Sequence, residues 1–482
     1  MEKIYSSEAL KNAEKSYCGI SLMEKAAKGI ILHLKKHLDG RPLTIVCGSG
    51  NNGGDGWAVA HLLNPYPVKV IFTDEPKTKE SIFYREKFHG VSISAHSPQA
   101  ITEILEAEII LDCIFGIGLC RDASGIYKKL IGLINESKAY VVSVDTPSGI
   151  SSDGGDFQNG VIANETICIT AKKLSGAVTP TKELYGKIFT HDIGVDMSRH
   201  SPLAVICDDE ILEFLPPRPK NSHKGTFGTL KTLCGSYYMT GAGFLSINAA
   251  LRSGVGLVKV FGEDKLLDIY KGQIHEPVYK RFSKEAFIEE NASAALIGCG
   301  IGAQFENQLK DILLNLKCPI ILDADGINFL SRNIDICEHI SASLIITPHP
   351  KEMARFCNLS ISEIQNNRFS ICKETSEKLG CTVVLKGEGT VICTPNHTPI
   401  INGTGNSGLA KGGSGDVLAG LIGGFAALGT SPHYAAALGV YLHGLAADSL
   451  KEKLSEFSFL PSDIPFEVGK ILAEKLRQNQ RS

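Results

Sequence analysis

The stretch Leu43-Thr-Ile-Val-Cys-Gly-Ser-Gly-Asn-Asn-Gly-Gly-Asp-Gly-Trp-Ala-Val-Ala60 decides the fold of the first part of the chain. An apolar, β-branched run leads into a glycine loop and then into a helical pattern, which predicts a strand, a turn and a helix. The loop contains GxGxxG, and the next predicted strand, Val68-Lys-Val-Ile-Phe-Thr-Asp74, ends in a carboxylate. Both features are typical of dinucleotide-binding dehydrogenases. The asparagines and the aspartate among the glycines are not.

The same alternation of strands and helices continues outward from this stretch. Near-continuous apolar strands separated by helices predict parallel sheets covered on both faces. We therefore expect two α/β domains: a Rossmann-like doubly wound sheet in residues 1–215 and a second α/β domain in residues 223–482. Residues 216–222 begin a proline-rich polar stretch and are the predicted linker. The strands are expected at 43–47, 68–72, 108–112, 140–144, 166–170, 229–234, 256–261, 294–298, 319–323, 343–347, 382–386 and 389–393.

Composition excludes several classes of protein. With 43% hydrophobic and 21% charged residues, the chain is an ordinary globular protein, and a net charge of −3 gives no basic field for nucleic acid. The first residues lack the apolar core of a signal peptide, and no apolar run is long enough to span a membrane. Many of the 14 cysteines lie in strand-like runs. This pattern is typical of free thiols in a cytoplasmic protein.

Polar side chains follow three predicted strands of the first domain. Asn51, Asn52 and Asp55 lie in the glycine loop, whereas Asp112 and Asp145 each end a strand. Because ligands of open α/β sheets bind at the carboxyl ends of strands, these loops are expected to line one crevice. Their oxygens suit a hard cation or a hydroxylated ligand. A tight turn with left-handed asparagines, and aspartates that merely cap helices, are the simpler interpretations.

In this order, Asn51-Asn-Gly-Gly-Asp-Gly56, Asp112 with Phe115-Gly-Ile-Gly118, and Asp145-Thr-Pro-Ser-Gly149 resemble the NAD(P)H-hydrate epimerase family. The resemblance covers nearly all of the first domain. It implies that a potassium ion is bound by Asn52, Asp112 and Ser148. It also implies contacts with hydrated NAD(P)H from Asn51, Asn52, Gly53, Gly54, Asp55, Gly116, Ile117, Gly118, Leu119, Cys120, Arg121, Asp122 and Asp145.

Epimerisation at C6 of the hydrated ring needs a proton shuttle and no hydride acceptor, so Asp145 is the candidate base. Two positions depart from the family pattern. Leu22-Met-Glu-Lys-Ala-Ala27 stands for the usual Leu-Met-Glu-Asn-Ala-Gly, and Gly116-Ile-Gly118 stands for Gly-Thr-Gly. The second change removes a hydroxyl from the loop after Asp112.

In the second domain, Gly412-Gly-Ser-Gly415 precedes a predicted helix that begins at Asp416. Such a loop gives a backbone anion site, where Asp416 can act as a base toward a hydroxyl that faces a phosphoryl group. Lys386 precedes glycines at a strand end, and His349 lies between two prolines. The simpler interpretations are a helix cap, an exposed lysine and a turn histidine bonded to the backbone.

This domain resembles ribokinase-like proteins through Gly413-Ser-Gly-Asp416, and more narrowly the ADP/ATP-dependent NAD(P)H-hydrate dehydratases. The narrower resemblance rests on 235–242, 249–258, 322–328, 347–352 and 412–420, and it spans residues 223–475. It implies hydrate contacts from Ala242, Gly302, His349 and Asp416. It further implies contacts with ADP or ATP from Lys386, Gly387, Glu388, Gly389, Thr390 and Gly415.

Two positions depart from the dehydratase pattern as well. Gly298-Cys-Gly-Ile-Gly302 stands for Gly-Pro-Gly-Leu-Gly, and Lys411 replaces a threonine beside the expected anion site. A lysine there could strengthen phosphate binding or change the nucleotide preference.

Together the two resemblances predict a bifunctional repair enzyme. It would interconvert the R and S hydrates of NADH or NADPH and dehydrate the S form with ADP or ATP. We expect potassium and magnesium ions, small-molecule partners only, and a homo-oligomer in the cytoplasm. Two alternatives stay open: a ribokinase-like vitamin kinase fused to a sugar-nucleotide-binding domain, and a first domain that only senses ligands or a partner protein.

Overall fold

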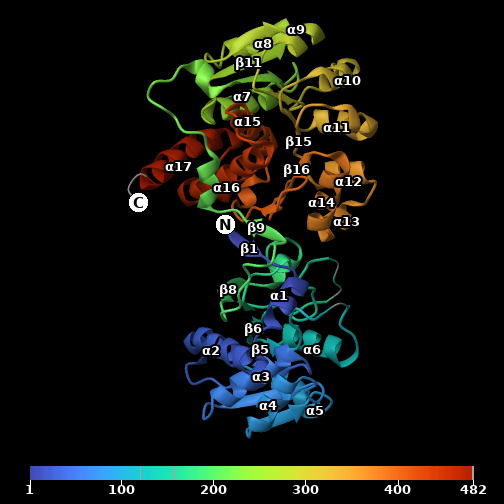
Figure 1. The fold of residues 1–482 in the computed structure, drawn as a ribbon, viewed down its shortest axis with the longest axis vertical. Coiled ribbons are helices and arrows are strands. Elements are labelled where there is room, and N and C mark those ends of the chain that lie inside the picture. The colour runs from blue at the N-terminus through green and yellow to red at the C-terminus, as the bar shows by residue number, and fades with distance from the viewer. Residues whose placement is uncertain (120, 156, 158, 480–482) are drawn as a thin grey trace. The chain divides into compact units, whose positions relative to one another are not determined.

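The computed structural model describes residues 1–119, 121–155, 157 and 159–479. These residues form two compact units, Lys3–Ala204 and Val205–Ser482, the latter together with Met1–Glu2. Each unit is built on a sheet whose strands alternate with helices along the chain (Figure 1). The chain is therefore an α/β protein with two largely parallel sheets, as expected from the sequence.

The first unit holds a seven-stranded sheet in the order β4-β3-β2-β5-β6-β7-β8, and all its pairs are parallel. Its elements are α1 (Ser7–Glu14), α2 (Gly19–Leu38), β2 (Leu43–Cys47), α3 (Asn51–Leu62), β3 (Val68–Phe72), α4 (Lys79–Lys87), β4 (Val91–Ser94), α5 (Pro98–Leu105), β5 (Ile109–Cys113), α6 (Gly125–Glu136), β6 (Tyr140–Val144), β7 (Glu165–Ile169) and β8 (Lys187–His191). Strand order reverses between β2 and β5. In such sheets, ligands bind at this switch point.

Side chains of these strands alternate between two cores. Ile45 and Leu111 pack with residues of α2, α3 and α4, whereas Val46 and Ile110 pack with residues of α5 and α6. Since successive strand residues point to opposite faces, helices cover both faces of the sheet. This confirms the prediction of a doubly wound first sheet.

The second sheet has the order β1-β9-β18-β17-β16-β15-β14-β13-β10-β11-β12. Its strands are β1 (Glu2–Ile4), β9 (Ala204–Ile206), β10 (Thr229–Leu233), β11 (Leu257–Gly262), β12 (Val278–Arg281), β13 (Ala294–Ile297), β14 (Ile320–Leu322), β15 (Leu344–Ile346), β16 (Thr382–Leu385), β17 (Val391–Cys393) and β18 (Ile400–Ile401). The pairs from β12 to β16 are parallel, and only β17 runs antiparallel to both of its neighbours. A second switch point lies between β10 and β13.

The helices of the second unit are α7 (Thr240–Arg252), α8 (Asp264–Lys271), α9 (Lys284–Glu289), α10 (Glu306–Asn315), α11 (Asp325–Arg332), α12 (Pro350–Cys357), α13 (Ile361–Asn366), α14 (Arg368–Leu379), α15 (Ser414–Ala427), α16 (Pro432–Ser458) and α17 (Ile464–Asn479). Helix α15 is almost wholly buried between α7 and α16. No helix among the described residues is both apolar enough and long enough to cross a bilayer.

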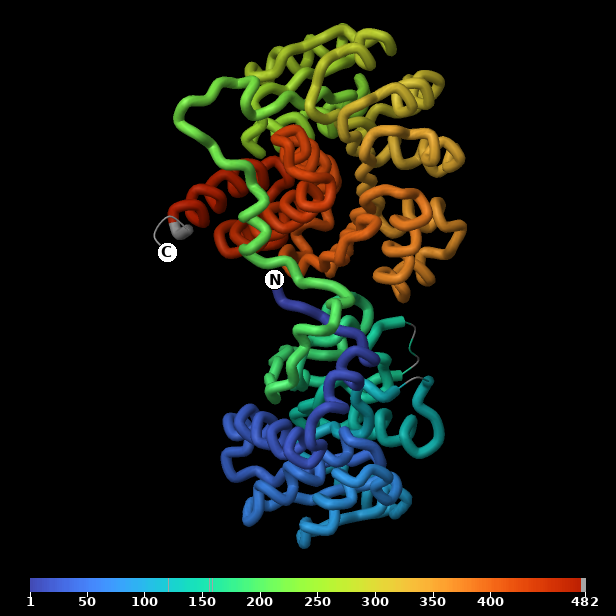
Figure 2. Tube along the Cα trace, in the orientation of Figure 1, coloured from blue at the N-terminus to red at the C-terminus, as the bar shows by residue number. Residues whose placement is uncertain are grey.

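The start of the second unit differs between the sequence prediction and the structure. β9 lies at Ala204–Ile206 and pairs with β18. Residues 207–228 then contain only short 3₁₀ turns and run as an extended green segment in Figure 2. The predicted linker at 216–222 lies within this segment. The compact unit begins earlier, at Val205, because β9 contributes backbone hydrogen bonds to the second sheet.

Candidate active sites

The glycine loop after β2 packs closely against its neighbours. A Cβ on Gly48 would lie 2.0 Å from the carbonyl oxygen of Ile114, and one on Gly53 would lie 1.8 Å from that of Gly48. Helix α3 begins at Asn51, and its N-cap, Gly50, offers no side-chain hydrogen bond. Neither Asn51 nor Asn52 has a positive φ, so the interpretation as left-handed turn asparagines is wrong. The loop leaves the first N–H groups of α3 without a side-chain cap.

Asp112, near the end of β5, is fully buried. Its carboxylate accepts hydrogen bonds from the hydroxyls of Ser143 (2.8 Å) and Ser148 (2.6 Å) and from the backbone N–H of Ser148 (2.9 Å). Burial raises the pKa of Asp112, and these hydrogen bonds offset part of the rise. Asp112 therefore fixes the turn after β6 and does not act as a helix cap.

Asp145 follows β6 with a positive φ of 69°. One carboxylate oxygen is 2.8 Å from Nζ of Lys173, and the other accepts the N–H of Ile117 at 3.2 Å. A Cβ on Gly116 would lie 3.0 Å from Asp145 Oδ2 and 3.2 Å from Asn52 Oδ1. The loops after β2, β5 and β6 therefore meet at one point, beside the first switch point.

Sequence reasoning missed two members of this cluster, Lys173 and Glu14. Lys173 is buried and also donates to the carbonyls of Ile169 and Ala171, both at 2.8 Å. Burial raises the pKa of Asp55 well above its ordinary value, and the charges of Asp145 and Glu14 add to the rise. Burial and Asp145 likewise raise the pKa of Glu14. Asp145 is thus paired with a buried ammonium while Asp55 and Glu14 keep a raised affinity for protons, an arrangement suited to holding and moving protons.

The remaining predicted positions of this site lie around the cluster. Gly118, Arg121 and Asp122 are exposed on the loop after β5, Leu119 is half-buried there, and Cys120 lies outside the described residues. Asp74 accepts a hydrogen bond from the Tyr127 hydroxyl at 2.7 Å.

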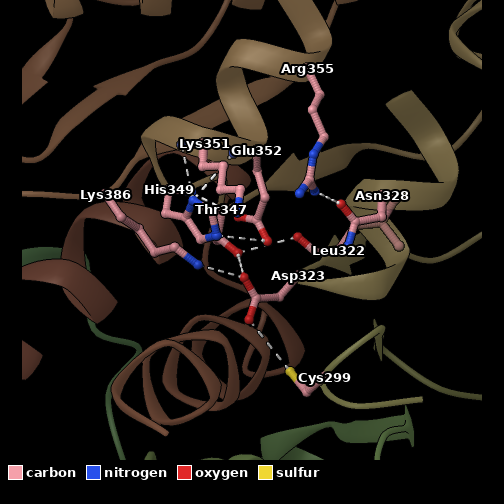
Figure 3. A network of polar contacts seen from close by, with 10 residues as sticks. All are labelled: Cys299, Leu322, Asp323, Asn328, Thr347, His349, Lys351, Glu352, Arg355 and Lys386. Atoms are coloured by element: carbon pink, nitrogen blue, oxygen red, sulfur yellow. Dashed lines mark hydrogen bonds and ion pairs between the residues drawn. The ribbon is translucent and has the colours of Figure 1, made fainter. Parts of the chain in front are cut away.

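The second site centres on Asp323, the residue directly after β14, which is 2% exposed. Its Oδ1 accepts hydrogen bonds from Thr347 Oγ1 at 2.7 Å and from Lys386 Nζ at 2.8 Å. In Figure 3 these side chains point toward Asp323, and Cys299 approaches from the opposite side. Burial lowers the pKa of Lys386, but the charges of Asp323 and Glu352 outweigh burial and raise it. Lys386 is therefore a paired cation of the site and not an exposed strand-end lysine.

Asp416 lies in the first turn of α15, whose N-cap is Gly413 with a φ of 102°. It is therefore not the helix cap. A Cβ on Gly415 would lie 3.3 Å from Lys386 Nζ and 3.8 Å from Asp323 Oδ2, so this helix end faces the Lys386–Asp323 pair. Burial, with the charge of Asp323, raises the pKa of Asp416 to about 6. Asp416 is thus ionised at neutral pH while it keeps some affinity for a proton.

The start of the loop from Lys386 to Thr390 is held by hydrogen bonds from Arg368, a buried residue that sequence reasoning missed. Its guanidinium donates to the carbonyls of Leu385 (3.1 Å) and Lys386 (3.2 Å). Gly387 has a φ of 140°, and a Cβ there would lie 2.8 Å from the guanidinium. The Thr390 hydroxyl closes the loop by donating to the carbonyl of Gly387 at 2.8 Å. Gly389 also has a positive φ, and Glu388 is exposed.

The His349 side chain is bonded to the backbone, as in the simpler interpretation. It is the N-cap of α12, and its Nδ1 accepts the N–H of Lys351 and of Glu352. Its Nε2 lies 3.5 Å from Glu352 Oε1 on the half-exposed side of the ring. Burial and the nearby Lys386 lower the pKa of His349, whereas burial raises that of Glu352 to about 7.

Gly302 lies in the loop after β13, and Ala242, near the start of α7, packs against the same loop. A Cβ on Gly300 would meet Ala242 Cβ at 2.7 Å, and the N–H of Gly302 donates to Asp325 Oδ2 at 2.8 Å. Between Asp323 and Asp325, Ala324 adopts φ 48° and ψ −112°, which strains a non-glycine residue. The loop after β13 and the turn after β14 are thereby fixed against each other.

Lys411 does not face a phosphate site. Its ammonium donates to the carbonyls of Glu456 (3.2 Å), Phe457 (3.0 Å) and Phe459 (2.5 Å). These carbonyls surround the C-terminal end of α16, where unpaired acceptors favour a cation. The expectation that Lys411 strengthens phosphate binding is therefore not supported by its contacts, which are structural.

Comparisons with known proteins match both parts of the chain. The N-terminal family model described as YjeF-related protein N-terminus matches residues 19–175, and the model for NAD(P)H-hydrate dehydratase matches residues 230–467. The bifunctional NAD(P)H-hydrate repair enzyme of Moorella thermoacetica is 32% identical over 95% of this chain and 93% of its own. The Escherichia coli protein of the same name is 31% identical over 88% of this chain and 84% of its own.

The chain belongs to the family of bifunctional NAD(P)H-hydrate repair enzymes. Among solved structures, the ADP/ATP-dependent NAD(P)H-hydrate dehydratase of Bacillus subtilis, co-crystallised with ATP and Mg²⁺, is 31% identical with a TM-score of 0.52. It matches 56% of this chain and 99% of its own. A ribokinase-like superfamily protein from Enterococcus faecalis is 28% identical, with a TM-score of 0.51, and the match covers 57% of this chain and 98% of that protein. The second unit of this chain is therefore ribokinase-like, as the sequence predicted.

Proposed function

We propose that this chain repairs hydrated nicotinamide nucleotides with two activities. The first unit epimerises the R and S hydrates of NADH and NADPH, and the second dehydrates the S hydrate with ADP or ATP. The single observation that carries the proposal is that each unit gathers a buried carboxylate–ammonium pair, Asp145–Lys173 or Asp323–Lys386, at the carboxyl ends of its parallel strands and beside a glycine-rich helix start. Family membership gives the substrate class.

In the first unit, Asp145 is the proposed base. Lys173 fixes one of its oxygens and Ile117 N–H the other, so the carboxylate is oriented toward the space beside Gly116. Inversion at C6 removes and returns the hydroxyl on opposite faces of the ring, and this requires proton transfer at that oxygen. Asp55 and Glu14, whose pKa values are raised by burial and by the charge of Asp145, would hold protons near Asp145.

Asn52, Asp112 and Ser148 fit a potassium ion. All three residues are buried and carry side-chain oxygens, and the Ser148 hydroxyl lies 2.6 Å from Asp112 Oδ1. Oxygen donors of this kind suit hard cations. The ion would place positive charge beside the substrate's polar groups.

In the second unit, Asp416 is the proposed base for the C6 hydroxyl of the S hydrate. The hydroxyl oxygen attacks the terminal phosphorus, the bond from that phosphorus to its bridging oxygen breaks, and the proton goes to Asp416. The phosphate then leaves C6 and a proton leaves C5, which restores the reduced ring. The net products are NAD(P)H, phosphate and the shortened nucleotide.

The remaining contacts of the second site bind and orient. The nucleotide phosphates would lie against the loop 386–390, which Arg368 holds, and against the N–H groups at Gly415. The hydrate would lie against Ala242, Gly302 and His349. The nucleotide would bring magnesium, for which Asp323 offers a carboxylate oxygen, and the ion would neutralise phosphate charge. The division into residues 1–215 and 223–482, a cytoplasmic location and a homo-oligomeric state stay predictions.

The test is incubation of the full chain with both epimers of NADPH hydrate, with and without ATP or ADP. We expect nucleotide-dependent return of the reduced-nicotinamide absorbance until both epimers are consumed, with one phosphate released per turnover. Without nucleotide the epimers interconvert but persist. A stable phosphorylated product without regained absorbance would instead support a kinase, and recovery of the R epimer unchanged would exclude an active first unit.

A further inference from the structure

A cavity of about 820 Å³ opens beside Gly302 in the second unit. Its walls come from the loop after β13, the start of α10, the length of α11 and one residue of α12. The residues that matter here are Gly302, Glu306, Asn328, Arg332 and Arg355. Binding sites for small molecules have volumes of roughly 300–1,000 Å³, so this cavity can hold a nucleotide-sized group.

The two arginines in its wall differ in how their charge is balanced. Arg332 is paired with Glu306, with Nη2 2.6 Å from Oε1. The guanidinium of Arg355 instead donates to the neutral side-chain oxygen of Asn328 (Figure 3). Among the residues that the structure describes, no carboxylate lies within ion-pair distance of Arg355. Arg355 is therefore an oriented cation without a counter-charge.

Arg355 is also connected to the reacting end of the site. It lies three residues after Glu352 on α12, a helix that begins directly after His349. Its positive charge contributes to the lowered pKa of His349 and opposes the raised pKa of Glu352. Since a helix rises about 5.4 Å per turn, Arg355 is about one turn beyond the residues that face Lys386 and Asp323.

The parts of a hydrated dinucleotide follow one another in the same order as Asp416, Arg355 and the cavity. Its ring would lie at Asp416, and a pyrophosphate follows one ribose further along the molecule. A guanidinium recognises phosphate with two parallel hydrogen bonds and keeps its charge at every relevant pH. We infer that the cavity receives the adenosine half of the hydrate and that Arg355, held by Asn328, binds its pyrophosphate. This inference rests on the proposed function of the second unit.

The test measures dehydration by the full chain at saturating ATP, with the S hydrates of NADH and NADPH as separate substrates. In Arg355→Gln we expect the KM for both hydrates to rise about ten- to hundredfold, with kcat within about twofold, because a hydrogen-bonded charge is lost from ground-state and transition-state binding alike. Arg355→Lys should recover part of the loss. Arg281→Gln, a matched change of an exposed arginine that is paired with Asp264 and does not line the cavity, should leave the KM within about twofold.

A second readout uses ADP-ribose, which carries the adenosine and the pyrophosphate but no nicotinamide ring. It should compete with the hydrate in the unaltered chain and lose this competition in Arg355→Gln. A KM rise for NADPH hydrate alone would mean that the arginine binds the 2′-phosphate, and a rise for ATP alone would assign the cavity to the nucleotide. Either result, or no change, overturns the inference. Failure of the proposed function is distinct, because the unaltered chain would then regenerate neither dinucleotide.

Discussion

Asp416 is tuned to accept a proton near neutral pH. Burial and the neighbouring charge of Asp323 raise its pKa to about 6, whereas Lys386 opposes the rise. A group with this pKa is ionised at pH 7 and is still a useful base. The same balance makes the dehydration rate sensitive to mild acid.

The first prediction concerns this pH dependence. Because the ionised carboxylate is the active form, kcat/KM for dehydration should be level above pH 7 and fall about tenfold per unit below the pKa of about 6. Asp416→Asn should lower kcat by about a hundred- to ten-thousandfold. Steady-state rates between pH 5 and 8, with circular dichroism at each pH, check both points.

Glu352→Gln is the matched control for that measurement. Burial raises the pKa of the Glu352 carboxyl group to about 7, so its titration could also lower the rate in mild acid. Glutamine removes this titration and can still accept the N–H of His349 that Glu352 accepts now. The acid limb near pH 6 should persist in this variant; its disappearance would transfer the role from Asp416 to Glu352.

Residue identities were predictable where the chain itself carries the pattern. Asp112, Asp145 and Asp416 each stand at the end of a strand or the start of a helix, and the structure brings them to the carboxyl ends of the parallel strands. Lys173 and Arg368 were not predictable. Each acts through carbonyls or a carboxylate contributed by another part of the chain, and no local spacing marks a buried cation. Lys411 was misjudged for the same reason, since its partners lie 45 to 48 residues away.

At the scale of elements, the glycine loop before α3 is a packing device as well as a binding loop. Gly53 is pressed against the backbone of Gly48, whereas a Cβ on Gly50 would meet nothing within 4 Å. The two glycines therefore differ in what they contribute, although the sequence motif includes both.

The second prediction compares these two glycines. Gly53→Ala places a Cβ against a carbonyl that cannot move without the strand, so it should lower the free energy of unfolding by about 1–3 kcal/mol or more. Gly50→Ala should change it by less than about 0.5 kcal/mol. The chain's single tryptophan, Trp57, is buried in α3, so denaturant unfolding followed by its fluorescence reports on this unit. Equal losses in both variants would contradict the packing argument.

Strands and long helices followed from the sequence because their apolar pattern is continuous. The predicted strands at 43–47 and 68–72 match β2 and β3 residue for residue. Six strands were not predicted: β1, β4, β8, β9, β12 and β18. β1, β9 and β18 have only two or three residues, too few for a pattern. β4, β8 and β12 lie at sheet edges and carry half-exposed, polar residues, so their pattern of burial is weak.

At the scale of the whole molecule, each unit contains all the described members of its own site. Glu14, Asp112, Asp145 and Lys173 lie within Lys3–Ala204, whereas Asp323, Lys386 and Asp416 lie within Val205–Ser482. No residue of one cluster is needed to complete the other. The two proposed reactions should therefore be separable by single substitutions.

The third prediction uses this separation. Asp145→Asn, which keeps a side chain that tolerates positive φ, should abolish epimerisation and leave dehydration of the S hydrate unchanged. Asp416→Asn should do the reverse. Mixing the two variant chains with both epimers and ATP should restore consumption of the R hydrate, because the S hydrate diffuses between them. If each variant alone works but the mixture does not, the intermediate passes only within one chain.

The strained backbone of Ala324 carries a consequence for how such a site persists. A residue with φ 48° and ψ −112° costs about 1–3 kcal/mol, and glycine would relieve that cost at once. Selection for stability alone would therefore remove the alanine, together with the fixed spacing between Asp323 and Asp325. A lineage that no longer suffers damage to its nicotinamide pool should lose this strain early, so relaxed geometry at this position would mark a chain whose repair activity is no longer under selection.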